Sequence, residues 1–424
     1  MLQGQDMFSC QDIRRRKRVC IVRHSYYPSD PRVRREVEAL AEAGYAVDVI
    51  CLRKEREKPE DIVSGAHVYR LPIQHRRGNP ISYLYEYFGF FTLALAKLTG
   101  LHLRNRYAVV QANNMPDFLV FTAIVPKLWG ARIILDIHDL MPELFASKFH
   151  VSRNSIAPKA LAAIERLACN FADHTITVTD LWRERICSRS TSVDRCTVLM
   201  NVADEKIFRR RSAWARRNGA HYRNGKCELI YHGALVRRYG VDVAIKAVKI
   251  AREAVPGCHL LVLGEGEQLE ELRHLVRELD LADAVTIGGE SLPAEVVARR
   301  IAEADFGIVP HRGDDFTTEI LPNKLLEYVR VGTPVIASRT RALQSYFDSS
   351  MLMYFEPDDA SDLARCIVQL HRQRSDAHRL ATQADVFNDT HDWRVIRDRY
   401  VQLVDSLCGI ATSRESVEST ESCT

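Results

Sequence analysis

The chain has 424 residues, of which 46% are hydrophobic and 27% charged, and its formal net charge is +4. This length and composition are typical of a globular protein with two or three domains. So small a net charge argues against a dedicated nucleic-acid-binding protein, which would carry a dense basic face. The 11 cysteines form no C-x-x-C pair, which favours reduced thiols over a disulfide framework or a zinc site. We therefore expect a cytoplasmic protein that binds no nucleic acid.

The first half of the chain alternates strand-like and helical segments after a basic lead-in at residues 1–18. A helix is expected at residues 31–43, because Asp30 suits its N-cap, Pro31 its first turn and Gly44 its end. Strands alternating with helices predict a parallel sheet covered by helices on both faces, here a Rossmann-like domain over residues 19–205. Short apolar runs place its strands at residues 19–23, 46–52, 108–111, 132–136, 175–178 and 197–199.

The alternation resumes after a predicted linker at residues 206–226, and a second doubly wound domain is expected over residues 227–390. A terminal helix at residues 391–408 and a disordered tail at 409–424, rich in Ser, Thr and Glu, complete the prediction. Ligands bind at the carboxyl ends of parallel strands. Two such domains facing each other would therefore form a cleft that holds a donor on one side and an acceptor on the other. Strands are expected at 228–232, 259–263, 284–287, 306–309 and 334–337, and helices at 241–253, 268–279, 293–303 and 323–331.

The segment from residue 319 to 327 carries the clearest chemical signal. Glu319 precedes a predicted helix and Glu327 lies within it. The unpaired N–H groups of a first helical turn attract phosphates, and carboxylates accept hydrogen bonds from sugar or ribose hydroxyls. Lys324 places a positive charge at the positive end of the helix dipole, a conflict that a bound anion would remove. A helix start with solvated charges has the same spacing, so the pattern alone leaves the function open.

This segment resembles the E-x7-E motif of family-4 retaining glycosyltransferases, which have the GT-B fold of two Rossmann-like domains facing across a cleft. The resemblance extends over roughly residues 19 to 405. It implies transfer of a sugar, with retention, from a nucleoside diphosphate sugar to an acceptor hydroxyl. It also implies that Glu319 contacts the transferred sugar as a catalytic group and that Glu327 holds the nucleotide ribose. Further donor-binding residues in this segment would be Ile320, Leu321 and Lys324.

Residues 231–240 resemble the glycine loop that opens the family's donor domain. Gly233 would let the backbone approach the diphosphate. Many family members carry Arg directly after this glycine and Lys directly before the next one, but here the two positions hold Ala234 and Tyr239. We expect Arg238 to take over the phosphate contact, because a planar guanidinium binds phosphate through two hydrogen bonds. A solvated surface arginine is the alternative.

His138 follows a predicted strand, in a segment that resembles the one carrying the family's active-site histidine. A histidine at the carboxyl end of a strand can bond a sugar hydroxyl or stabilise charge, although a lone histidine is more often structural. The sequence holds no G-K-S/T phosphate loop, no H-E-x-x-H and no clear D-x-D, and the pair Asp314-Asp315 is typical of a solvated loop. We therefore expect no required cofactor and no metal, with the nucleotide sugar as substrate.

The resemblance also implies partners and a setting. The donor would be a UDP-sugar or a GDP-sugar, and the acceptor a saccharide or a lipid-linked molecule in polysaccharide or glycolipid biosynthesis. Two alternatives remain open. One is a nucleotide-sugar epimerase on the same fold. The other is a non-catalytic partner of another glycosyltransferase, which the departures at positions 234 and 239 keep open.

Residues 80–106 combine aromatic side chains with basic neighbours. The longest uncharged run, residues 87–96, is much shorter than the roughly 20 apolar residues that a membrane-spanning helix needs, so we expect none. Aromatic residues beside basic ones suit a helix lying in a membrane interface, and a core helix is the alternative. We expect peripheral contact with the inner face of a membrane. The residues concerned are Tyr83, Tyr85, Tyr87, Phe88, Phe90 and Phe91, flanked by Arg76, Arg77, Lys97, Arg104 and Arg106.

Overall fold

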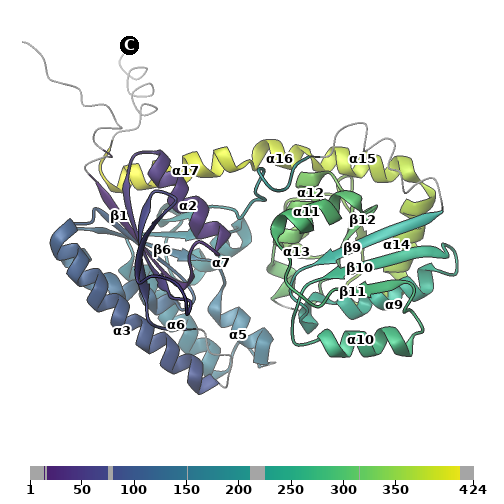
Figure 1. Cartoon of the computed structure of the whole chain (residues 1–424), viewed down its shortest axis with the longest axis horizontal. Helices are drawn as coiled ribbons and strands as arrows, with labels where there is room; N and C mark the ends of the chain where they lie inside the picture. The colour runs from purple at the N-terminus through teal and green to yellow at the C-terminus, as the bar shows by residue number, and fades with distance from the viewer. Residues whose placement is uncertain are drawn as a thin grey trace, which may run out of the picture. The chain divides into compact units, whose positions relative to one another are not determined.

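The computed structural model describes residues 14, 17–74, 80–149, 151–210, 225–314 and 316–410, and for residues 80–84 the backbone only (Figure 1). Most of the basic lead-in, most of the predicted linker, and the tail beyond residue 410 lie outside these ranges. So do Arg76, Arg77, Asp315 and the side chain of Tyr83. The chain divides into two units, one formed by Met1–Met200 with Arg394–Thr424 and the other by Asn201–Trp393.

The first unit contains an eight-stranded sheet with the order β3-β4-β2-β1-β5-β6-β7-β8. Its strands pair in parallel except for the hairpin β3–β4 at one edge. The sequence prediction missed this hairpin, although Ser64 and Gly65 form its turn with positive φ angles. The strands are β1 (Arg18–Tyr26), β2 (Ala46–Leu52), β3 (Glu60–Val63), β4 (Ala66–Leu71), β5 (Val109–Asn113), β6 (Arg132–Ile137), β7 (His174–Thr177) and β8 (Cys196–Val198).

The helix α2 (Pro31–Glu42) begins and ends as its sequence predicts. The Asp30 side chain accepts a hydrogen bond from the Val33 N–H, Pro31 occupies the first turn, and Gly44 has a φ of +100°. The other helical segments of this unit are α3 (Pro80–Asn105), η1 (Asp117–Ala123), α4 (Ile124–Leu128), α5 (Met141–Phe149), α6 (Ile156–Phe171), α7 (Asp180–Arg189), η2 (Val193–Arg195) and α17 (Trp393–Leu407). Within the described residues, no helix combines the length and the apolar character needed to cross a membrane.

Helix α17 is fixed to the first unit by buried polar contacts. The Asp405 carboxylate accepts hydrogen bonds from the Tyr45 hydroxyl at 2.7 Å and from Arg14 Nε at 2.8 Å. The Tyr400 hydroxyl donates to Gln111 Oε1 at 2.7 Å. Ile410, within the predicted tail, is buried and its N–H donates to the Asp405 carbonyl. Gly409 and Ile410, the first two residues of the predicted tail, therefore close the end of this helix, and the rest of that tail lies outside the described residues.

The second unit contains a six-stranded sheet with the order β11-β10-β9-β12-β13-β14, and all of its pairings are parallel. Its strands are β9 (Lys226–His232), β10 (Gly257–Leu263), β11 (Val285–Ile287), β12 (Phe306–Val309), β13 (Val335–Ser338) and β14 (Met353–Phe355). Its helical segments are η4 (Arg237–Tyr239), α9 (Val241–Ala251), α10 (Leu269–Glu278), α11 (Ala294–Glu303), η5 (Thr317–Glu319), α12 (Asn323–Val331), α13 (Arg341–Gln344), α14 (Ala360–Arg372), α15 (Arg374–Ala384) and α16 (Val386–Thr390).

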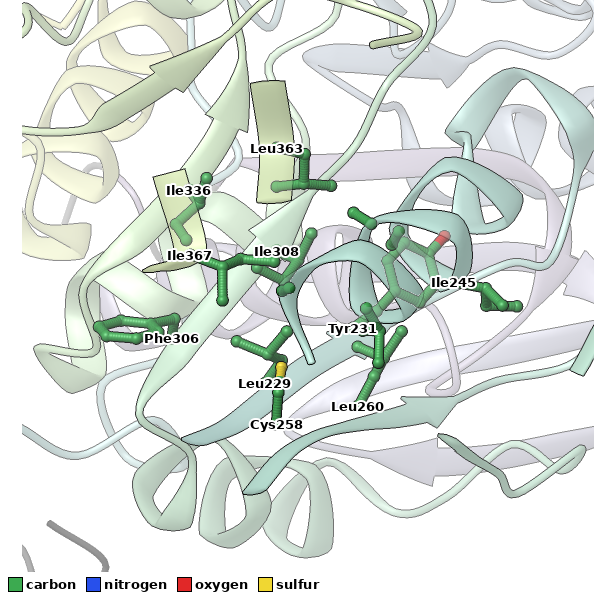
Figure 2. Packing of buried hydrophobic residues seen from close by; sticks show 14 of the residues in the cluster. Leu229, Tyr231, Ile245, Cys258, Leu260, Phe306, Ile308, Ile336, Leu363 and Ile367 are labelled. Atoms are coloured by element: carbon green, nitrogen blue, oxygen red, sulfur yellow. The ribbon is translucent and has the colours of Figure 1, made fainter. Parts of the chain in front are cut away.

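The core of the second unit lies between this sheet and the helices that cover it. Leu229 of β9 and Ile308 of β12 pack with Ile245 of α9 and with Leu363 and Ile367 of α14 (Figure 2). Strands buried on both faces read as continuous apolar runs, which is how the sequence indicated them. The predicted class, α/β with two Rossmann-like doubly wound domains, is confirmed for both units.

The strand order fixes where a ligand can bind in each unit. In the second sheet, the chain proceeds from β9 outward to β10 on one side and later returns to β12 on the other. Such a reversal leaves a crevice at the carboxyl ends of the two central strands, which is the usual ligand position in open α/β sheets. In this unit β9 ends at His232 and is followed by Gly233, and β12 is followed by Pro310 and His311.

Candidate functional site

The loop after β9 is held against the loop after β10 by backbone contacts that require glycine. Gly233 has a φ of +125° and Gly264 a φ of +148°, and a Cβ on Gly264 would lie 1.9 Å from the Gly233 carbonyl oxygen. The Gly233 N–H donates to the Leu263 carbonyl at 2.9 Å. A Cβ on Gly266 would lie 2.3 Å from the Leu235 carbonyl oxygen. The sequence Gly264-Glu-Gly266 is therefore part of this site, and more than an isolated tight turn.

Lys324 lies in the first turn of α12 and reaches this glycine loop. Its side chain is buried, and its amino group donates to the Tyr231 hydroxyl at 3.3 Å. The Nζ atom also lies 4.5 Å from the ring centroids of both Tyr231 and Tyr239. A Cβ on Gly233 would lie 3.1 Å from Lys324 Cε and would crowd it, and the positive φ of this residue favours glycine in any case. Burial lowers the pKa of Lys324 to about 7, with the nearby Glu327 charge acting in the opposite direction.

The two predicted carboxylates lie on either side of this lysine in the chain. Glu319 is buried at the end of η5, and Glu327 lies within α12, where its Oε2 is 3.0 Å from His232 Nε2. Ile320 and Leu321 connect η5 to the helix and are partly exposed. Helix α12 starts after Pro322 without a side-chain cap. Its first N–H groups are therefore available to an anion, as the sequence indicated.

Arg238 lies in η4, on the same loop as Tyr239. Its guanidinium carbon lies 5.3 Å from the Tyr239 ring centroid and 5.9 Å from that of Phe316, and its Nε is buried without a hydrogen-bond partner. Within the described residues it makes no ion pair with a carboxylate. The neighbouring Arg237 is exposed. The side chain of Arg238 thus faces the inner wall of the loop, which is the position that a phosphate-binding arginine needs.

Arg312 holds this loop in place, and the sequence reading missed it. Its Nη2 donates to both carboxylate oxygens of Asp242 at 2.7 Å, and its Nη1 pairs with Asp358. Its Nε donates to the Arg237 carbonyl at 2.9 Å. A Cβ on Gly240 would lie 1.9 Å from the Pro310 carbonyl oxygen, so the loops after β9 and β12 touch through their backbones. The pair with Asp242 fixes the start of α9, and the contact with the Arg237 carbonyl fixes η4, against the loop after β12.

His311, the second residue after β12, was also missed. Its side chain is 1% exposed, and its ring stacks on that of Tyr239 with centroids 4.8 Å apart. Neither ring nitrogen has a hydrogen-bond partner among the described residues. Burial lowers the pKa of His311 well below its usual value, and the charges of Lys324 and Arg238 lower it further. Its place at the strand reversal was the signal that could have identified it.

In the first unit, His138 lies one residue beyond β6. Its Nε2 lies 2.8 Å from Asp136 Oδ2 and 3.1 Å from Asn113 Nδ2, and its backbone N–H donates to Asn114 Oδ1 at 2.7 Å. Burial lowers the pKa of His138 to about 4, although Asp136 acts in the opposite direction. The ring is therefore neutral at pH 7, and a neutral imidazole that donates from Nε2 keeps Nδ1 as an acceptor.

A buried charge network surrounds this histidine. Arg32 donates to both oxygens of Asp136, at 2.8 and 3.2 Å, and to Glu36 Oε1 at 3.1 Å. Gln111 Nε2 donates to Glu36 Oε2 at 2.8 Å. Burial and the neighbouring Asp136 raise the pKa of Glu36 to about 8. Burial would also raise the pKa of Asp136, but Arg32 and His138 hold it below its usual range.

Glu36, Asp136 and His138 together resemble a set of metal ligands, since one donor atom from each lies within 4.8 Å of the others. Arg32, however, donates to oxygens of both carboxylates. A divalent cation would have to displace this guanidinium and would then sit beside its charge. The arrangement fits a network that is already neutralised better than it fits a metal centre.

The aromatic residues of α3 divide between the core and the surface. Phe90 is fully buried, and the buried Glu86 pairs with His24 of β1 at 3.0 Å. Tyr85 is 78% exposed and Phe88 is 55% exposed, with the Phe88 ring stacked on that of Phe118. One face of the helix is therefore core, as the alternative prediction had it, and the opposite face presents aromatic surface.

A groove of about 550 Å³ lies between α9 and α14, on helices that cover the second sheet. Its lining includes Ile250, Glu253, Arg365, Val368 and Arg372. These residues lie on helix faces and not at the carboxyl ends of strands. The position of the groove therefore does not match the site where an open α/β sheet binds its ligand.

Two families match the chain, one in each unit. The "Glycosyl transferase 4-like domain" model matches residues 29–201, and the "Glycosyl transferases group 1" model matches residues 226–373. The amylovoran biosynthesis glycosyltransferase AmsK of Erwinia amylovora is 23% identical over 204 residues, which are 47% of this chain and 48% of the relative. The GDP-mannose-dependent alpha-(1-6)-phosphatidylinositol monomannoside mannosyltransferase of Mycobacterium tuberculosis H37Rv is 30% identical over 189 residues, 44% and 49% of the two chains.

The matched part of the chain thus spans about half the length of these two curated relatives. Among solved structures, sucrose-phosphate synthase from Thermosynechococcus elongatus aligns with a TM-score of 0.74 and 20% identity. The alignment covers 92% of this chain and 99% of that one. At this level of identity the likeness establishes a shared fold and says nothing about the substrate of this chain.

Proposed function

Since this chain belongs to the family-4 glycosyltransferases of the GT-B fold, we propose that it transfers a hexose, with retention, from a nucleoside diphosphate sugar to an acceptor hydroxyl. The observation that carries this proposal is the pair of basic side chains, the buried Lys324 and the partly buried Arg238, at the strand reversal of the second unit beside an uncapped helix start. A diphosphate is the ligand that such a site fits best.

The proposal gives each donor-site residue a role. Lys324, Arg238 and the first N–H groups of α12 bind the diphosphate and stabilise its charge as the sugar bond breaks. Gly233 leaves room for the diphosphate beside the loop. Glu327 accepts hydrogen bonds from the ribose, and Glu319 contacts the transferred sugar. Ile320 and Leu321 present backbone and apolar surface between the two carboxylates. These cations do the work that a metal would do elsewhere, so the proposal requires no metal and no cofactor.

The first unit is proposed to bind the acceptor. A neutral His138, whose Nε2 is held by Asp136 at the carboxyl end of β6, can accept a hydrogen bond from a sugar hydroxyl at Nδ1. The resemblance to family-4 enzymes implies that the acceptor hydroxyl attacks from the same face of the sugar as the leaving diphosphate. The role of the first unit is then to position that hydroxyl, which is the main contribution that a protein makes to such a step.

The donor is proposed to be a UDP-sugar or a GDP-sugar, and the acceptor a saccharide or a lipid-linked molecule of polysaccharide or glycolipid biosynthesis. One relative is named as GDP-mannose-dependent and another as an enzyme of amylovoran biosynthesis, which supports this setting. We place the protein in the cytoplasm with peripheral contact at the inner membrane face. The exposed Tyr85 and Phe88 of α3 support that contact.

Membrane contact can be tested by sedimentation with anionic liposomes at low salt. Wild-type protein should pellet with the vesicles, and Tyr85→Ser with Phe88→Ser should remain in the supernatant. Val193→Ser, an exposed apolar residue of η2 in the same unit, serves as the matched control and should still pellet. Wild-type protein that stays in the supernatant would point to a soluble acceptor.

The proposed activity is tested first by thermal shift with a panel of nucleotide sugars. A true donor present at about 100 times its Kd should stabilise the protein by about 2.7 kcal/mol. The donor that binds is then incubated with and without saccharide and lipid-linked acceptors. Conversion of the sugar without any acceptor would favour the epimerase alternative. Failure of all nucleotide sugars to bind would favour a non-catalytic partner.

A further inference from the structure

Three cationic or protonatable side chains surround one aromatic ring in the donor site. The Tyr239 ring stacks on His311, lies 4.5 Å from Lys324 Nζ, and lies 5.3 Å from the guanidinium carbon of Arg238. Lys324 and His311 are 6% and 1% exposed. Tyr239 therefore screens both groups from water, and low solvation disfavours a charge on either of them.

The surrounding carboxylates do not neutralise this cluster. The titratable groups around Lys324 are Tyr231 and His232 of β9, Arg238 and Tyr239 of η4, His311 after β12, and Glu327 of its own helix. Of these only Glu327 is anionic; its Oε2 lies 3.0 Å from His232 Nε2, and its charge favours the protonated form of Lys324. Asp242, which lies just beyond η4, is bound by Arg312 through both of its oxygens. Glu327 is therefore the carboxylate that opposes the basic side chains of this site, while Asp242 is occupied by Arg312.

We propose that Lys324 and His311 make the donor site proton-coupled, so that the diphosphate binds together with a proton that Lys324 takes from solvent. This inference rests on the proposed function, because it assumes that the ligand carries a diphosphate. The amine of Lys324 gains one proton and becomes an ammonium ion beside the phosphate oxygens, and no other bond changes. His311, whose ring nitrogens lack partners among the described residues, is the second group that can take up a proton, at lower pH.

The surroundings of Lys324 explain why the coupling arises in this chain. Its Nζ lies 4.5 Å from the ring centroids of both Tyr231 and Tyr239, and its side chain is buried. A buried lysine with a pKa of about 7 is half charged at neutral pH when the site is empty. The apparent affinity for an anion then falls with the charged fraction, about tenfold for each pH unit above about 8.

The test is isothermal titration calorimetry of the full chain with UDP-glucose and GDP-mannose, whose diphosphates carry no titrating group near neutral pH. The measured enthalpy is compared between HEPES and Tris, whose enthalpies of ionisation differ. Wild-type protein at about pH 8 should take up close to one proton per donor bound, since most Lys324 is then uncharged when the site is empty. The Kd should rise about tenfold between about pH 8 and pH 9.

Two variants assign the proton. Lys324→Arg keeps a permanent charge, so its uptake at about pH 8 should fall to near zero. Lys249→Arg, on the exposed face of α9, is the matched control and should retain the wild-type uptake. His311→Asn should leave the uptake at about pH 8 intact and remove the smaller uptake that remains at about pH 6.

The outcomes separate this inference from the proposed function. A nucleotide sugar that binds with equal enthalpy in both buffers, and with a Kd that does not change between pH 7 and 9, overturns the proton coupling and leaves the transferase proposal standing. Uptake that persists in Lys324→Arg assigns the proton to another group and likewise overturns the inference. Failure of every nucleotide sugar to bind overturns both proposals.

Discussion

The two units differ in whether the basic side chains at the carboxyl ends of their sheets have carboxylate partners. In the first unit, Arg32 donates to Asp136 and to Glu36, whose raised pKa of about 8 keeps it largely protonated at pH 7, so the buried Asp136 charge has an opposite partner within hydrogen-bond distance. In the second unit, Lys324 and Arg238 make no ion pair with a carboxylate among the described residues. A compensated network fixes side-chain geometry before any ligand arrives. In a cluster of basic side chains without carboxylate partners, the positive charges repel one another until an anion binds. Such a cluster lowers the stability of the ligand-free protein in exchange for anion binding.

The largest effect should come from breaking the compensated network. Arg32→Met leaves Glu36 and Asp136 buried without their cation, which should lower the free energy of unfolding of the first unit by about 3–5 kcal/mol. The measurement is urea denaturation followed by hydrogen exchange within that unit, because two units need not unfold together. Arg34→Met is the matched control on the same helix, where a partly exposed pair with Glu38 at 3.9 Å should contribute at most about 1 kcal/mol. Equal effects of the two variants would mean that the network is not compensated as described.

In the second unit, removal of a buried charge is expected to raise the free energy of unfolding. Lys324→Met removes a buried charge that lacks a close counter-ion, so the ligand-free unit should gain about 1–4 kcal/mol while losing donor binding. The folded pKa of about 7 lies below the usual 10.5, so the unfolded state holds more protons between these values. The destabilisation due to Lys324 is therefore fully present below pH 7 and disappears as the pH rises toward 10.5. The gain in thermal stability of Lys324→Met should shrink in the same direction. A variant that is less stable than wild type at about pH 6 would contradict this account.

Arg238 tests whether the cationic cluster binds phosphate as a whole. Arg238→Ala should weaken nucleoside diphosphate binding by about 1.5–3 kcal/mol, the scale of a hydrogen bond to a charged group. Arg237→Ala is the natural control, because that exposed neighbour contributes its carbonyl and not its side chain to the contact with Arg312. Calorimetry with UDP and GDP measures both variants. If Arg237→Ala weakens binding and Arg238→Ala does not, the phosphate contact belongs to the other arginine.

Substitution of Glu319 should mainly affect turnover, whereas substitution of Glu327 should mainly affect nucleotide binding. Glu319→Ala should lower kcat about tenfold or more, which corresponds to about 1.4 kcal/mol, with little change in nucleotide binding. Glu327→Ala should mainly raise the Kd for the nucleotide, because it removes a ribose contact and frees His232. Glu303→Ala, on the exposed end of α11, controls for loss of a surface carboxylate. Wild-type kinetics in both site variants would remove these residues from the site.

The sequence could predict elements whose signals are local. Helix α12 spans the residues expected for it, 323–331, and Asp30 caps α2 as expected, because periodicity and capping depend on neighbouring residues. It could not predict that Arg32 and Glu36 are buried. Two opposite charges four residues apart are typical of a solvated helix face, and only the sheet beneath α2 shows that they belong to the interior.

The same limit applies to the donor site. Arg312 and His311 meet the loop at residues 237–240 across about seventy residues of sequence, through backbone contacts that a single sequence does not reveal. A strand end at the sheet reversal marks where a ligand binds, but it does not say which side chain reaches it. The glycines of the loop were recognisable because their role depends on their own backbone conformation.

The smallest effect should come from the support that α17 gives to the compensated network. The Tyr400 hydroxyl donates to Gln111 Oε1, and Gln111 in turn donates to Glu36. Tyr400→Phe removes one neutral hydrogen bond from a buried position and should destabilise the first unit by about 1 kcal/mol. Tyr45→Phe is the matched comparison on the same interface, because its hydroxyl donates at 2.7 Å to the charged Asp405 and should matter more, about 1.5–3 kcal/mol. Hydrogen exchange of β5 and α17 measures both. Neither change touches the second unit, so the Kd for nucleotide should stay at its wild-type value. If Tyr400→Phe alters that Kd, the charge network of the first unit influences the donor site, and the two clusters are not independent.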